Sequence, residues 1–220
     1  MIKLNSKAVV LKRIICVLII IVALINVFFA GFNFVYIKTY VKGKSMYPTL
    51  NVNVSSNEVG DKIYINKFAK VNKNDIIVLN FKEEGSYIIK RLIAMEGDIV
   101  NIEANEELGQ YNLLVNNQIM YVKPYIFDVY GQKIEYTTYK SFISYVNENK
   151  DDESRIYQED GVIKGVIIKE DEVYLLGDNW SVSKDSSIMG PYKKQDVIGK
   201  VDFIIPKGAN TFKTILKQIF

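Results

Sequence analysis

The chain opens with one long apolar block and continues as short apolar segments separated by polar turns. Residues 14–37 contain no charged side chain and are mostly Ile, Val, Leu and Phe, with Asn26 and Asn33 as the strongly polar interruptions. At a rise of about 1.5 Å per residue, a helix of this length exceeds the ~30 Å hydrocarbon core of a bilayer. The pattern predicts one transmembrane helix at 14–37, preceded by a short segment, residues 1–13.

The flanking charges predict how this helix is oriented. The segment before it carries Lys3, Lys7, Lys12 and Arg13. The positive-inside rule therefore places residues 1–13 in the cytoplasm and residues 38–220 outside the cell membrane. The alternative is a cleaved secretory signal, but such a signal has a shorter apolar region and a small-x-small cleavage site, which residues 28–30 match poorly.

The remainder of the chain reads mostly as strands. Short segments rich in β-branched and aromatic residues, separated by Gly, Asn or charged turns, occur at 62–65, 75–81, 87–93, 98–102, 172–176 and 198–205. Strands at this spacing predict a mainly β fold, an antiparallel β-barrel-like domain over residues 38–220.

Two segments depart from the strand pattern. Residues 123–170 are rich in Tyr and charge and predict an inserted variable lobe, with a short helix at 141–146. The tail, residues 211–220, places Phe212, Ile215, Leu216, Ile219 and Phe220 on one helical face. This helix either packs on the β domain or rests on the membrane surface.

The composition excludes several classes of enzyme. The chain of 220 residues has no histidine. It therefore lacks Ser-His-Asp and Cys-His catalysis, His-ligated zinc and the HExxH metalloprotease motif. The formal charge of +3 is small and spread along the chain, so it argues neither for nor against nucleic acid. We expect no nucleic-acid partner. The single Cys16 forms no intrachain disulfide, and we expect neither a metal nor a cofactor.

The first candidate for chemistry is a loop just beyond the apolar block. Residues 43–50 read GKSMYPTL, so that Gly43 and Pro48 bracket Ser45 in a tight turn. Such a loop can expose a serine hydroxyl and direct backbone N–H groups at an oxyanion. Serines in Gly/Pro loops are common, however, and an ordinary turn remains the alternative.

The second candidate is a lysine within a predicted strand. Residues 87–93 read YIIKRLI, and the period of two places Ile88, Lys90 and Leu92 on one face. Burial on an apolar face lowers the pKa of a lysine and makes its neutral amine a usable general base. The alternative is that Lys90 extends its long stem outwards to solvent.

The third candidate is a polar segment after a predicted strand. Residues 177–187 read GDNWSVSKDSS, in which a Gly-Asp-Asn turn leads into closely spaced Ser and Asp residues. These side chains can hydrogen-bond and orient a neighbouring amine. A solvated polar loop is the alternative.

Together, the three segments resemble the type I signal peptidases, which are Ser/Lys serine proteases. Residues 45–50 resemble the Ser-Met-x-Pro-Thr-Leu box of that family, and residues 87–98 the Lys-Arg box that ends in Gly-Asp. Residues 177–186 resemble the Gly-Asp-Asn-x-x-x-Ser-x-Asp-Ser box, and residues 74–78 the box before the lysine. The resemblance covers roughly residues 41–102 and 172–201. It implies a membrane-bound endopeptidase that cuts secreted preproteins after small residues.

The resemblance also implies roles for individual residues. Ser45 matches the nucleophile, and its backbone N–H contributes to the oxyanion hole. Lys90 matches the general base, and Ser183 the residue that orients its amine. Asp185 matches a structural residue. At Gly43 some relatives carry a serine whose hydroxyl assists the oxyanion hole, whereas this chain offers only backbone there.

Two positions depart from the family pattern. Trp180 and Ser187 stand where the family usually has arginine. The resemblance implies that the second arginine pairs with the aspartate matched by Asp185. Asp185 therefore either lacks this partner or has it replaced by Lys184, Lys193 or Lys194.

These departures leave a second function open. A catalytically weak or inactive relative would act as a membrane-anchored assembly factor for surface proteins. A self-cleaving repressor-type Ser/Lys protein is disfavoured because an apolar block stands where a DNA-binding domain would be. A purely structural extracellular module is disfavoured by the ordered motifs.

Overall fold

A computed structural model describes residues 6–52, 54–55, 58–82 and 85–219. The chain divides into two compact units, Met1–Ile37 and Lys38–Phe220. Of the residues used in the predictions above, Lys3 and Phe220 lie outside the described part.

The first unit is built on one long helix, α1 (Ser6–Val35). Its section Val9–Val35 is long and apolar enough to cross a membrane. The helix thus begins earlier than the predicted span and ends two residues before it, because Tyr36 and Ile37 belong to strand β1 (Tyr36–Tyr40).

A seven-stranded sheet carries most of the predicted strands. Its order is β1-β2-β14-β3-β4-β12-β13, and the pairings recorded within it are antiparallel. The further strands are β2 (Lys62–Asn66), β3 (Ile76–Phe81), β4 (Ser86–Met95), β12 (Glu172–Leu176), β13 (Tyr192–Lys193) and β14 (Val197–Ile205). The prediction of a mainly antiparallel β fold after one apolar helix is confirmed.

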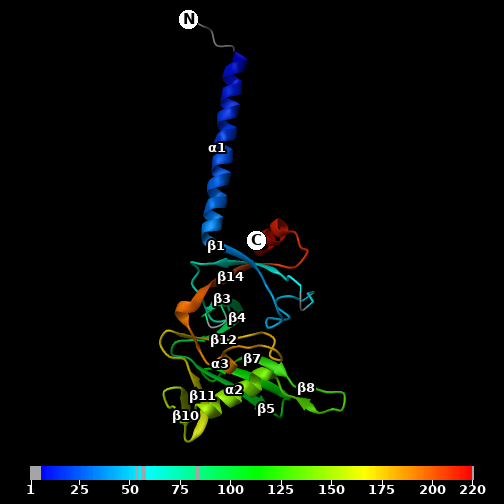
Figure 1. Ribbon diagram of the computed structural model, residues 1–220, viewed down its shortest axis with the longest axis vertical. Coiled ribbons are helices and arrows are strands. Elements are labelled where there is room, and N and C mark those ends of the chain that lie inside the picture. Colours follow the sequence, from blue (N-terminus) through cyan, green and yellow to red (C-terminus); the bar gives the residue numbers. More distant parts are fainter. Residues whose placement is uncertain (1–5, 53, 56–57, 83–84, 220) are drawn as a thin grey trace. The chain divides into compact units, whose positions relative to one another are not determined.

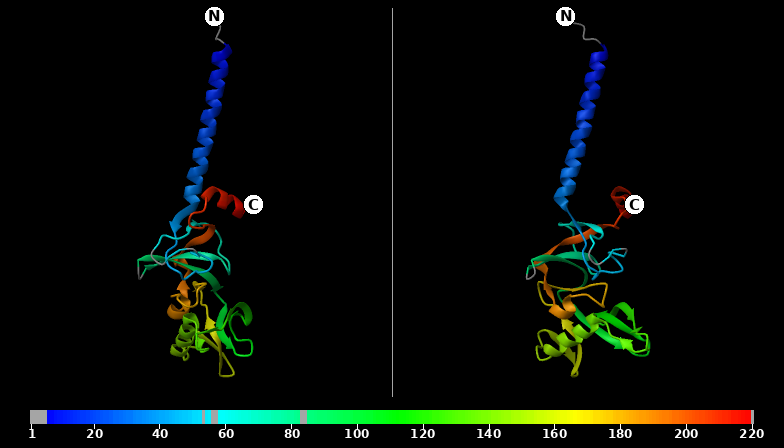
Figure 2. Two further views of the ribbon diagram at one scale, coloured as in Figure 1. Left: turned by 90° about the vertical axis from the view of Figure 1, so that its right-hand side faces the viewer. Right: turned by 45° about the vertical axis from the view of Figure 1, so that its right-hand side comes forward.

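A second sheet of five strands, in the order β10-β11-β5-β6-β7, lies beside the first. Its members are β5 (Ile99–Asn105), β6 (Gln110–Val115), β7 (Gln118–Pro124), β10 (Ile156–Glu159) and β11 (Val162–Ile167). Figures 1 and 2 show these strands gathered with helix α2 in one part of the unit. The segment 123–170 therefore shares its sheet with strands that precede it in the chain. A short hairpin, β8 (Ile126–Phe127) and β9 (Lys133–Ile134), projects from this part.

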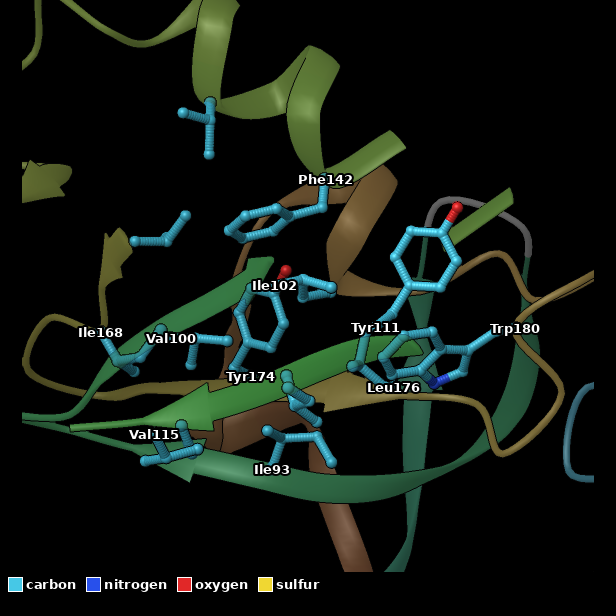
Figure 3. Close-up of a cluster of buried hydrophobic side chains, with 14 of the residues drawn as sticks. Ile93, Val100, Ile102, Tyr111, Val115, Phe142, Ile168, Tyr174, Leu176 and Trp180 are labelled. Carbon is cyan, nitrogen blue, oxygen red and sulfur yellow. The ribbon is translucent and has the colours of Figure 1, made fainter. Parts of the chain in front are cut away.

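Helix α2 (Thr137–Glu148) covers the core of the second sheet. Thr138, Phe142 and Val146, four residues apart, are its buried side chains, which is the spacing that aligns residues on one helical face. The predicted helix at 141–146 is confirmed and extends further at both ends. Figure 3 shows Phe142 pointing from α2 towards the side chains of the sheet.

The last helix, α4 (Thr211–Ile219), contacts β14. The Gln218 side chain accepts a hydrogen bond from the Ile204 N–H (3.1 Å) and donates one to the Ile204 carbonyl (2.7 Å). Phe212, Leu216 and Ile219 remain exposed. The helix therefore packs on the β domain, and its rest on a membrane surface stays a prediction. Two short helical segments, α3 (Ser186–Met189) and η2 (Lys194–Asp196), flank β13.

A buried polar pair, Asn51 and Asp61, closes the loop that follows β1. The Asp61 N–H donates to the Asn51 side chain (2.8 Å), and the Asn51 N–H donates to the Asp61 carboxylate (2.7 Å). The Asn51 amide also donates to the carbonyl of Gly43 (2.8 Å). Asn51 adopts φ +60°, a left-handed conformation that Asn tolerates better than most residues.

We expect Asn51→Ala to lower the free energy of unfolding by about 1–3 kcal/mol, because it leaves the buried Asp61 N–H without an acceptor. Denaturant unfolding followed by circular dichroism measures the change. Asn147→Ala, on the exposed side of α2, is the matched control and should leave stability nearly unchanged. Equal stability of the two variants would show that the pair is dispensable.

Candidate active site

Apolar residues fix the serine loop on the first sheet. Met46 and Leu50 are 2% and 1% exposed and pack in a core with Val41, Ile63 and neighbouring residues. Ser45 lies between exposed Lys44 and buried Met46 and is half-buried. Gly43 adopts φ +78°, a conformation that favours glycine. The loop therefore holds Ser45 at the surface through its neighbours' side chains.

The turn after β12 holds the backbone on either side of Ser45. The Asn179 N–H donates to the carbonyl of Ser45 (2.9 Å), and the Asn179 side-chain amide donates to the carbonyl of Lys44 (3.1 Å). Among the bonds of the described residues, no acceptor takes the Ser45 N–H. That N–H is therefore available for an oxyanion, as the resemblance implies.

Gly177 allows this close approach. A Cβ built on Gly177 would lie 2.5 Å from the carbonyl oxygen of Ser45 and 2.2 Å from Oγ of Ser183. Both distances are far below van der Waals contact. A glycine is consequently required where the turn passes the serine loop.

An ion pair that the sequence analysis missed joins all three segments. Arg91, on β4, binds Asp178 with two hydrogen bonds, from Nε (2.7 Å) and from a terminal nitrogen (2.6 Å). The Thr49 hydroxyl donates to the same carboxylate. Arg91 and Asp178 lie inside the matched motifs, but nothing in their spacing reveals the pairing.

Lys90 lies on β4 opposite Ile77 of β3 and is only 4% exposed. Burial lowers its pKa, while the negative charges of Asp185 and Asp178 oppose that shift without reversing it. In the described part of the chain no carboxylate forms an ion pair with its amine. The alternative that Lys90 extends into solvent is wrong.

Ser45 and Lys90 line the same two clefts. One cleft has a volume of about 510 Å³ and extends towards Phe81 and Tyr192. The other has a volume of about 390 Å³ and runs along β1 and the start of β4. Gly43, Ser45, Ile88 and Lys90 belong to the walls of both clefts. The structure thus places the two residues that the sequence singled out in the walls of the same clefts.

Ser183 is buried, at 1% exposure, and its Oγ lies close to Gly177, as does the carbonyl oxygen of Ser45. Its hydroxyl has no hydrogen-bond partner among the described residues. A buried unpaired hydroxyl is costly. The predicted bond from Ser183 to the Lys90 amine is not formed here, and the orienting role of Ser183 stays a prediction.

The expectation that a lysine replaces the missing arginine beside Asp185 is wrong. Asp185 is fully buried and accepts hydrogen bonds from the Gly177 N–H (2.9 Å), the Ser187 N–H (3.1 Å) and the Ser187 hydroxyl (2.8 Å). Lys193 instead pairs with Glu172 (3.3 Å). Ser187, at the position where the resemblance implies arginine, is itself a partner of Asp185. Asp185 is the N-cap of α3, and its carboxylate accepts from the N–H and the hydroxyl of Ser187.

The family model described as signal peptidase, peptidase S26, matches residues 11–206. The chain belongs to this family. The match includes the serine loop, Lys90 and the turn after β12.

Curated members of the signal peptidase family cover most of the chain. A signal peptidase I P from Bacillus subtilis subsp. natto is 30% identical over 178 residues, which are 78% of this chain and 77% of that protein. A signal peptidase IB from Staphylococcus aureus (strain N315) is 27% identical over 188 residues, 83% of each chain. A crystal structure of a signal peptidase I from Enterococcus faecalis matches with a TM-score of 0.33 and 20% identity, covering 60% of this chain and 97% of that one.

We expect Asp185→Ala to destabilise the turn after β12, residues 177–187, which we call the catalytic turn. The change leaves the buried N–H of Gly177 without an acceptor. A loss of about 1–3 kcal/mol in the free energy of unfolding is typical of such a group. Denaturant unfolding measures it, with Asp151→Ala at an exposed turn as the control. Wild-type stability of Asp185→Ala would contradict the bracing role.

Proposed function

We propose that this signal peptidase family member removes signal peptides from secreted preproteins, with Ser45 as nucleophile and Lys90 as general base. The observation that carries the proposal is the buried Lys90 amine, which lines the same clefts as Ser45 and has no ion-pair partner among the described residues. Relatives that carry the name signal peptidase I support the substrate class. They do not favour the alternative of an inactive assembly factor.

The geometry supports a two-step acyl transfer. The neutral Lys90 amine takes the proton of the Ser45 hydroxyl as its oxygen attacks the scissile carbonyl carbon. The Ser45 N–H stabilises the oxyanion that forms. The Lys90 ammonium then gives its proton to the leaving amine as the C–N bond breaks. An acyl-enzyme on Ser45 and a free new N-terminus result.

The second step returns the enzyme to its starting state. The neutral Lys90 amine takes a proton from water, whose oxygen attacks the acyl carbon. The bond to Ser45 breaks, and the serine oxygen recovers the proton from Lys90. Burial suits Lys90 to both steps because it favours the neutral amine at lower pH.

We expect the substrate peptide to bind in an extended conformation. An extended peptide directs its first and third side chains to the same face, as the specificity for small residues before the cut requires. We propose that such a peptide lies across Ser45 by pairing with an exposed strand edge. Backbone hydrogen bonds would then hold the peptide, and shallow pockets would select small side chains such as that of alanine.

We further propose that α1 anchors the chain with its N-terminus in the cytoplasm. Lys12 and Arg13, together with Lys7 before them, support this orientation. Residues 38–220 would then act on the outer face, where translocated preproteins emerge. The predicted division into residues 1–13, 14–37 and 38–220 belongs to this proposal.

Purified full-length protein in detergent micelles should cleave a preprotein with a small-x-small site, as followed by gel shift and mass spectrometry. Ser45→Ala and Lys90→Met should each lower the rate at least ~10³-fold, because each removes a reacting group. Ser144→Ala and Lys150→Met, at exposed positions, are matched controls that should retain activity. Full cleavage by Ser45→Ala would refute the mechanism.

The pH dependence tests the base directly. The amine is active when neutral, so kcat should rise with pH through the pKa of Lys90. Because burial lowers that pKa, the inflection should lie below the ~10.4 of a free lysine. Asp185→Asn removes a charge that raises the pKa of Lys90 and should move the inflection to still lower pH. A shift to higher pH would contradict this electrostatic account.

Orientation has its own test. In a Cys16→Ser background, Asp151→Cys should react with a membrane-impermeant maleimide in intact cells. A cysteine at the same site that reacts only after lysis would reverse the proposed topology. Loss of about thirty residues from the mature protein would instead indicate a cleaved signal.

A further inference from the structure

Trp180 is a buried anchor in the second core. It is 3% exposed and packs edge-to-face against Tyr136, with ring centroids 6.0 Å apart. Its carbonyl accepts a hydrogen bond from the Thr138 N–H at the start of α2 (3.0 Å). Figure 3 shows its indole within the cluster that also contains Tyr111 and Phe142. The residue at the usual arginine position therefore ties the catalytic turn to the second sheet.

Lys123, at the end of β7, holds the same turn from another side. Its amine donates to the carbonyl of Asp178 (3.0 Å) and lies 5.8 Å from the centre of the Trp180 ring. The first contact is a charge-assisted hydrogen bond and the second a cation–π interaction. Two independent contacts thus connect β7 to residues 178–180.

The same turn also hydrogen-bonds to the backbone of the proposed nucleophile, Ser45. Asn179 lies between the two residues that Lys123 contacts, and it donates to the carbonyls of both Ser45 and Lys44. A shift of the turn would therefore shift the backbone of Ser45. A misplacement of about 1 Å can cost ~10²-fold in rate.

We propose that Lys123 and Trp180 are positioning residues, through which the second sheet and α2 hold Ser45 in its reactive place. This inference depends on the proposed function of Ser45. Neither residue lines the two clefts that Ser45 and Lys90 share. Their loss should consequently lower kcat and leave KM nearly unchanged.

The surroundings of Trp180 explain why arginine is unsuitable in this chain. A third cleft, of about 340 Å³, is lined by Arg91, Lys123, Asp178 and Trp180 among others. Among the described residues that line this cleft, Asp178 is the one acid, and Arg91 already binds its carboxylate with two hydrogen bonds. A guanidinium in place of the indole would add a third positive charge without a new counter-charge.

The experiment compares full-length variants in detergent micelles on one cleavable preprotein. Lys123→Met should lower kcat about 10- to 100-fold with KM within about twofold, and Lys123→Arg should recover most of the loss. Lys133→Met is the matched control: Lys133 also lies over a tyrosine ring, that of Tyr125 (4.3 Å), and pairs with Glu106 (2.8 Å). Neither of these two contacts of Lys133 involves residues 178–180, so Lys133→Met should retain the kcat of the wild type.

Trp180→Arg, which restores the usual family residue, should also lower kcat. Its effect and that of Lys123→Met should be less than multiplicative in the double variant, because both act through one turn. Should the Trp180 variant fail to fold, the Lys123 series alone carries the test, with melting temperature measured for each variant.

Several outcomes would overturn the inference. They are wild-type kcat in Lys123→Met, an equal loss in Lys133→Met, or a loss of activity that only follows a loss of folded protein. Wild-type cleavage that Ser45→Ala abolishes would leave the proposed function intact in each case. Absence of cleavage by the wild type would instead refute the proposed function itself.

Discussion

A buried lysine amine that forms no ion pair with any described residue is the constraint on which the rest of this structure depends. Desolvation disfavours the charged form of Lys90, and a nearby carboxylate would restore it. Two acids, Asp178 and Asp185, do act on Lys90, yet both are bound elsewhere. Arg91 holds Asp178, and Gly177 and Ser187 hold Asp185. The two carboxylates therefore lie near enough to act on the Lys90 amine by their charge, but neither forms an ion pair with it.

The same contacts that occupy the acids also assemble the site. The bond from Arg91 to Asp178 joins β4 to the turn after β12, and Thr49 adds the serine loop. Asn179 then fixes the backbone around Ser45. The acceptors in these bonds are backbone carbonyls or the Asp178 carboxylate. None of these bonds uses the Ser45 hydroxyl or the Lys90 amine. Such preorganisation is what acyl transfer demands of its reacting groups.

The two departures from the family pattern follow a common logic. Ser187 satisfies Asp185 with a hydroxyl and an N–H, and Trp180 replaces a charge by apolar packing. Both positions are buried, at 3% exposure for Trp180 and 0% for Ser187. Because burying an unpaired charge is costly, an uncharged hydroxyl and an uncharged indole suit these two buried positions. Trp180 ties the turn to the core of the second sheet, whereas Ser187 supports Asp185 within the turn itself.

The sequence by itself determined the apolar helix, most strands of the first sheet, the face of β4 that carries Lys90 and the ordered motifs around Ser45. These depend on local periodicity and spacing, which a chain displays without its fold. Strands β6, β7, β10 and β11 were missed, since β7 is largely exposed and the turn between β6 and β7 uses Asn116 and Asn117 at positive φ. Only the tertiary structure decided that the face of Lys90 is covered, that Ser187 partners Asp185 and that Lys123 reaches the turn. Periodicity predicts which side chains share a face. Their burial and hydrogen bonding depend on which segments, distant in sequence, pack against that face.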